Sequence, residues 1–116
     1  MKNNVIREIT ALSAIILTAA LGRIHNGDHI ETWYNLRMDK VIERADSIYG
    51  ITDAYVVRED GVKTYNGLVI CAADWSVYPF GSLVETTLGT GIVLDTHTTQ
   101  GTVIDIATSW GKRGKK

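Results

Sequence analysis

Residues 68–73 read Leu-Val-Ile-Cys-Ala-Ala, an uninterrupted apolar run with the length of a β-strand. A run without polar alternation is typical of a strand that is covered on both faces. Asn66-Gly67, the strongest hairpin signal in the chain, precedes the run, and Asp74 follows it. We therefore expect residues 68–73 to form a buried strand, with Cys71 as a small core side chain rather than a nucleophile.

Similar short segments, separated by turn residues, occur on both sides of this run. They cover residues 31–34, 54–58, 62–65, 83–87, 92–94 and 103–107. Only residues 35–50 have the apolar period of a helix, and Gly50 is a signal for its end. The chain has 116 residues and a mass of 12.8 kDa, which is enough for one small domain. The sequence predicts a mainly β protein with one or two helices, built as a small barrel.

The second helix would lie at the N-terminus, where residues 9–22 contain no charged side chain. Fourteen residues span about 21 Å as a helix, which is less than the roughly 30 Å of a bilayer core. Lys2 and Arg7 precede the apolar stretch, and small residues lie at its end. We expect residues 1–22 to be a signal peptide cleaved before Arg23, or an uncleaved N-terminal anchor. An amphipathic first helix of the domain is the other interpretation.

Charge is unevenly distributed along the chain. Residues 23–111 carry six basic and twelve acidic side chains, a net charge of −6, and residues 112–116 form a basic tail. An acidic domain is a poor nucleic-acid binder, because such binding needs a contiguous basic face. Residues 23–30 are polar and predict a linker, so the domain is expected over 31–111. His25 and His29 lie in this linker, but Asn26-Gly27 between them favours solvated loop over a helical zinc pair.

Three carboxylates lie where strands are expected to end or within one. Asp74 follows residues 68–73, Asp95 follows 92–94, and Asp105 interrupts 103–107. A carboxylate in such a position is unfavourable unless it is hydrogen-bonded. Taken singly, Asp74 and Asp95 could end turns and Asp105 could face solvent. The spacing alone leaves these interpretations open beside a shared carboxylate site.

The same residues resemble a known family, the three-aspartate (3D) domain of bacterial cell-wall enzymes. The resemblance covers about residues 32–111 and rests on three segments: AADWSVYPFGSLVE (72–85), GTGIVLDT (89–96) and VIDIA (103–107). Thr32-Trp33-Tyr34 is similar to the family's opening Thr-x-Tyr, and residues 60–63 resemble a Gly-Val-Lys segment of some members.

This resemblance implies a six-stranded double-psi β-barrel, with three carboxylates at one end of a sugar-binding groove. It also implies cleavage of peptidoglycan glycan strands, most simply as a lytic transglycosylase. Asp105 would be the general acid and base, and Asp95 and Asp74 would hold negative charge near the developing cation. The resemblance further implies a monomeric, exported protein that is extracellular or associated with the cell wall. Its partner is glycan, with no cofactor, metal or nucleic acid, and with membrane contact only through an uncleaved N-terminal segment.

The substrate-binding candidates are Thr32 and Lys63 as hydrogen-bonding groups, and Tyr34 and Trp75 as stacking rings, with Trp33 as a further aromatic candidate. Lys63 has an alternative interpretation as an exposed hairpin lysine, and each aromatic residue has an alternative interpretation as part of the barrel core. His97 lies in a loop that departs from the family, because His97-Thr98 stands where glycines are usual. This departure keeps open a non-catalytic barrel that binds wall glycan or a partner protein.

Overall fold

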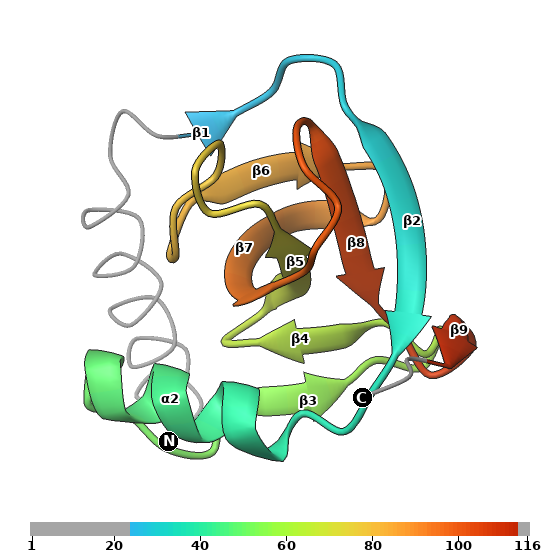
Figure 1. The fold of residues 1–116 in the computed structure, drawn as a ribbon. Helices are drawn as coiled ribbons and strands as arrows, with labels where there is room; N and C mark the ends of the chain where they lie inside the picture. Colours follow the sequence, from blue (N-terminus) through green and yellow to red (C-terminus); the bar gives the residue numbers. More distant parts are fainter. Residues whose placement is uncertain (1–23, 114–116) are drawn as a thin grey trace.

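The computed structural model describes residues 24–113 and shows a mainly β protein with one helix. Its strands form one sheet that curls into a half-barrel (Figure 1). The expected signal peptide or anchor at residues 1–22 and the last three residues of the basic tail lie outside the described residues. No helix in the described part is long and apolar enough to cross a membrane.

The sheet has nine strands, more than the six that the family resemblance implies. The elements in chain order are β1 (Ile24–His25), β2 (Ile30–Asn35), α2 (Asp39–Tyr49), β3 (Tyr55–Val57), β4 (Lys63–Tyr65), β5 (Leu68–Ala73), β6 (Leu83–Thr86), β7 (Gly89–Thr96), β8 (Val103–Ala107) and β9 (Lys112–Arg113). The main path runs β1-β6-β7-β5-β8-β2-β9, and β3 and β4 branch from β5. All the strands that the sequence predicts are confirmed, and β1 and β9 are additional.

Strand β5 lies at the centre of the sheet and is buried from Val69 to Ala73, as its composition predicts. Its side chains alternate between two apolar clusters. Ile70 and Ala72 belong to the cluster that also contains Val41 and Ala45 of α2. Val69, Cys71 and Ala73 point to the opposite face, where the second cluster lies. Cys71 is fully buried, which confirms its place as a core side chain, and this burial raises the pKa of its thiol.

Helix α2 covers one face of the sheet (Figure 1). It ends as the sequence predicts, because Gly50 adopts a left-handed conformation with φ of 68° and its N–H bonds to the Asp46 carbonyl. It begins at Asp39, later than expected, since Asn35 continues β2 and the Leu36 carbonyl accepts a hydrogen bond from Lys63. The helix therefore starts immediately after the connection that leaves β2.

The segment expected as a linker, residues 23–30, contributes to the sheet instead. Ile24 and His25 pair with β6, and the chain then crosses to β2 on the other side of the sheet (Figure 1). His29 is not a solvated loop residue, because its side chain is only 8% exposed and its Nε2 lies 2.8 Å from Glu31 Oε2. The His29 ring is held by its contacts with Glu31 and with the Gly27 carbonyl.

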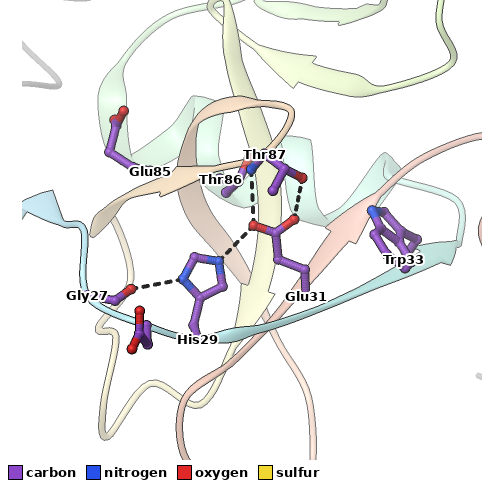
Figure 2. A pocket seen from close by; sticks show the side chains of 8 residues that line it. Gly27, His29, Glu31, Trp33, Glu85, Thr86 and Thr87 are labelled. Atoms are coloured by element: carbon purple, nitrogen blue, oxygen red, sulfur yellow. Dashed lines mark hydrogen bonds and ion pairs between the residues drawn. The ribbon is translucent and has the colours of Figure 1, made fainter.

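Glu31 joins β2 to the turn between β6 and β7, as Figure 2 shows. Its carboxylate accepts hydrogen bonds from the Thr87 hydroxyl at 2.6 Å and from the Thr87 N–H at 3.0 Å. Although burial alone would raise it, these bonds and His29 hold the pKa of Glu31 below its usual value. An ionised Glu31 therefore ties together strands that lie four positions apart in the sheet order.

At the end of β2, the backbone is approached closely by Gly111, which leads into β9. A Cβ placed on Gly111 would lie 2.5 Å from the Tyr34 nitrogen and 2.7 Å from the Trp33 carbonyl carbon. These backbone atoms belong to a strand that is paired on both sides, so they have no room to move. Only glycine fits this position while β9 stays paired with β2.

Gly111→Ala is expected to lower the free energy of unfolding by about 1–3 kcal/mol, the usual effect of overpacking. The matched control is Gly27→Ala, because a Cβ at Gly27 would meet nothing within 4 Å. Urea unfolding of both variants measures the difference. Equal stability of the two variants would show that Gly111 does not hold β9 against β2.

Candidate functional site

Two of the expected carboxylates lie in one row across the middle of the sheet. Ala72 of β5 is paired with Asp95 of β7 on one side and with Asp105 of β8 on the other. Thr32 of β2 continues the row, because it is paired with Asp105. Adjacent strands lie about 4.8 Å apart, so the backbones of Asp95 and Asp105 are separated by about 10 Å across a small alanine.

A bulge in β7 brings Asp95 into this row. The register shifts between Cys71 and Ala72: Cys71 is paired with Val93, but Ala72 is paired with Asp95. Without the extra residue, the alternation of β7 would place Asp95 on the face of Val93, away from α2. Bulges redirect side chains in this way and are frequent next to functional sites.

Strand β2 supplies a hydroxyl donor to each carboxylate. The Thr32 hydroxyl donates to Asp105 Oδ1 at 2.8 Å, and the Tyr34 hydroxyl donates to Asp95 Oδ2 at 3.0 Å. Tyr34 reaches past β8 because Ala107, its partner in register, has a short side chain. Burial and the charge of Asp95 raise the pKa of Tyr34 well above its usual value, so its hydroxyl remains a proton donor.

The surroundings of Asp105 raise the pKa of its carboxyl group above the usual value. The Asp105 side chain is half-buried, and this burial raises its pKa. The negative charge of Asp95 raises the pKa further. The hydrogen bond from Thr32 and the proximity of His97 act in the opposite direction, and the net pKa stays above the usual value. The charge of Asp95 therefore contributes to the raised pKa of Asp105.

Asp74 is placed differently from the other two carboxylates. Its Oδ1 accepts hydrogen bonds from the Ser76 N–H at 2.9 Å and the Ser76 hydroxyl at 2.7 Å. Its Oδ2 accepts one from the Gly101 N–H at 3.1 Å, and these bonds lower the pKa of Asp74. Gly101 has a φ of +91°, a conformation that favours glycine. Asp74 thus holds the loop between β7 and β8.

His97 lies in that loop and interacts electrostatically with both Asp74 and Asp105. Its Nε2 lies 3.3 Å from the Val103 carbonyl, so Nε2 carries the hydrogen of that contact. The other ring nitrogen is buried and has no hydrogen-bond partner within residues 24–113. The side chain expected to reach substrate therefore contacts Val103 of β8 and acts on Asp74 and Asp105 only through charge.

Trp75 lies next to Asp95, where its indole N–H donates to the Asp95 carbonyl at 2.9 Å. The Arg44 guanidinium of α2 lies 5.8 Å from the centre of the ring, and Phe80 meets the ring edge-on. A groove of about 500 Å³ runs between α2 and Asp95. Its lining residues are Leu36, Arg37, Asp39, Lys40, Val41, Arg44 and Asp95.

Lys63 does not approach the carboxylates, and the interpretation of it as an exposed hairpin lysine is wrong. The residue is only 7% exposed, and its ammonium group donates to Asn35 Oδ1 and to the Leu36 carbonyl, both at 2.8 Å. Burial lowers its pKa. Lys63 stabilises the connection from β2 to α2, which forms one end of the groove.

Trp33 points to the opposite face of β2 from Thr32 and Tyr34. It lines a second hollow of about 520 Å³ with His29, Glu31 and the β6–β7 turn (Figure 2). It also packs against Trp110 at 6.0 Å between ring centres, and both rings are partly exposed. Trp33 is therefore separated from the carboxylate row by the sheet.

Sequence reasoning missed the residues that support this site. Ser76 and Gly101 hold Asp74, and Arg44 covers Trp75. The spacing Asp74-x-Ser76 is a turn signal that indicates the first of these contacts. In the described part of the chain, no three His, Cys, Asp or Glu side chains are grouped as metal ligands. Models of protein families, curated proteins and solved structures contain no match to this sequence or fold.

Proposed function

We propose that this chain is a three-aspartate domain protein that cleaves peptidoglycan glycan strands as a lytic transglycosylase. We propose further that its curled sheet is a double-psi β-barrel. The observation that supports the activity best is the row of Asp95, Ala72 and Asp105, in which the pKa of Asp105 is raised beside a second carboxylate. In such a pair, the carboxyl group with the raised pKa can donate a proton, and the ionised carboxylate beside it can stabilise positive charge.

In the first step, the carboxyl group of Asp105 donates its proton to the glycosidic oxygen between N-acetylmuramic acid and N-acetylglucosamine. The bond from C1 to that oxygen breaks, and positive charge develops on C1 and the ring oxygen. Asp95, held by the Tyr34 hydroxyl, places negative charge beside this cation.

In the second step, the carboxylate of Asp105 takes the proton of the muramic C6 hydroxyl, whose oxygen forms a bond to C1. The product is a 1,6-anhydro sugar, and Asp105 recovers its proton without consuming water. Thr32 orients the carboxyl group through its hydrogen bond to Oδ1. Asp74 acts at a distance, because it holds the loop that carries His97.

Incubation of the full chain with purified peptidoglycan, followed by mass spectrometry of the fragments, tests this proposal. Fragments with anhydro-muramic ends would support it. Reducing muramic ends would indicate a hydrolase that uses the same carboxylates. Binding without cleavage would favour the alternative function, a non-catalytic barrel for wall glycan, and neither binding nor cleavage would overturn both. We also propose that the protein is exported to reach this substrate and that it acts as a monomer, without cofactor, metal or nucleic acid.

Thr32→Val is expected to move the descending limb of the activity profile to higher pH. The Thr32 hydroxyl stabilises ionised Asp105, so its removal raises the pKa of the acid further. Asp105 must be protonated for the first step, and it then retains its proton to a higher pH. The measurement is kcat/KM against pH, with Thr32→Ser as the control that keeps the hydroxyl. A limb that stays in place or moves down would contradict the assignment of Asp105 as the acid.

A further inference from the structure

The groove beside Asp95 carries positive charge on an otherwise acidic protein. Residues 24–113 contain seven basic and twelve acidic side chains, a net charge of −5. Three of those seven cations, Arg37, Lys40 and Arg44, line this one groove. A negatively charged substrate would be repelled by most of the surface and attracted here.

Two of these cations are free to meet a ligand. Arg37 is paired with Asp39 at 2.5 Å, whereas Lys40 and Arg44 form no ion pair within the described residues. They are four residues apart on α2 and therefore lie on the same side of the helix. Arg44 contacts the ring of Trp75, so its guanidinium extends toward the β7 end of the groove.

The groove is continuous with the carboxylate row through Asp95. Asp95 lines the groove and also interacts with Asp105, so one residue borders both the reacting atoms and the basic wall. A sugar ring bound at Asp95 and Asp105 would direct a substituent past Asp95 toward Lys40 and Arg44. The chemistry of such a substituent must include an anionic group, because the wall offers two unpaired cations.

We propose that this groove binds the carboxylates of the peptide substituent on the muramic sugar, with Lys40 and Arg44 as their counter-charges. The proposal rests on the proposed function, because it assigns a further part of the same substrate to a further part of the same site. The enzyme then prefers glycan that carries acidic stem peptides over glycan whose stem carboxylates have been neutralised.

Two forms of one substrate test this preference. Soluble peptidoglycan fragments are used with their stem carboxylates free, or converted to amides so that the shape is kept and the charge is removed. We expect kcat/KM to be about tenfold higher for the free form, mainly through KM, and the difference to shrink as salt is added. The double variant Lys40→Gln/Arg44→Gln should lose this preference, so that its kcat/KM for the free form falls to its own kcat/KM for the amidated form.

The matched control is Lys112→Gln/Arg113→Gln, which removes the same charge from β9, outside the groove lining. A loss of preference in this control, or its retention in the groove variant, would overturn the proposal.

A binding measurement separates this inference from the proposed activity. The free-carboxylate fragments are titrated into 15N-labelled protein, and the backbone signals of residues 39–45 are followed by NMR. Shifts there that are absent with amidated fragments support the groove even if the parent cleaves nothing. No shifts there would overturn the groove even if the parent forms anhydro products.

Discussion

Asp105→Asn is expected to reduce cleavage about 10³-fold, within the range for loss of a general acid and base. The amide has the shape of the carboxyl group and still accepts the hydrogen bond from Thr32, but it has no proton to donate to the glycosidic oxygen. Product formation from peptidoglycan measures the loss. A variant with near-parental activity would show that another group carries the proton.

The same variant should fold at least as stably as the parent at neutral pH. The raised pKa means that the folded state favours protonated Asp105, so its ionised form opposes folding above that pKa. The contribution of Asp105 to the free energy of unfolding is present at pH values below its pKa in the unfolded chain. It is lost as pH rises through the raised pKa that Asp105 has in the folded state. The difference in the free energy of unfolding between Asp105→Asn and the parent should therefore shrink as pH falls. Urea unfolding at neutral and acidic pH distinguishes lost chemistry from lost structure.

Asp95→Asn is expected to reduce cleavage about 100-fold and to move the descending limb of the pH profile to lower pH. The rate falls because the developing cation loses its counter-charge. The limb moves down because the charge of Asp95 helps to raise the pKa of Asp105. This direction is opposite to that expected for Thr32→Val, although both substitutions are adjacent to the same acid.

Glu85→Gln controls for the change in net charge, because Glu85 lies on the β6–β7 hairpin and lines the hollow on the other face of the sheet. Its profile should match that of the parent. If Asp95→Asn left the limb unmoved, or if Glu85→Gln moved it equally, the pair of Asp95 and Asp105 would not be the coupled site described above.

Much of the fold is readable from local patterns. The run at residues 68–73 predicts the buried strand β5, and Gly50 predicts the end of α2, because both signals depend on neighbouring residues alone. Strands β1 and β9 are two residues long and depend on distant partners, β6 and β2. Their pairing leaves no periodic trace in the sequence.

The site is less predictable than the fold, because its geometry depends on register. The sequence places Asp95 after an apolar strand, but only the bulge opposite Ala72 turns it toward Asp105. The sequence motif groups Asp74 with the other two carboxylates, yet its oxygens bind Ser76 and Gly101. Lys63 is buried because its ammonium group finds two oxygens at the end of β2, a contact between segments 27 and 28 residues apart.

Cleavage in water enriched in 18O tests the central claim most directly. If Asp105 closes the C6 oxygen onto C1, the muramic ends carry no 18O and are lighter than reducing ends by one water. Incorporation of 18O at C1 would show that water is the nucleophile and would contradict the transglycosylase account. The same unlabelled anhydro yield from Asp105→Asn as from the parent would contradict the role of Asp105.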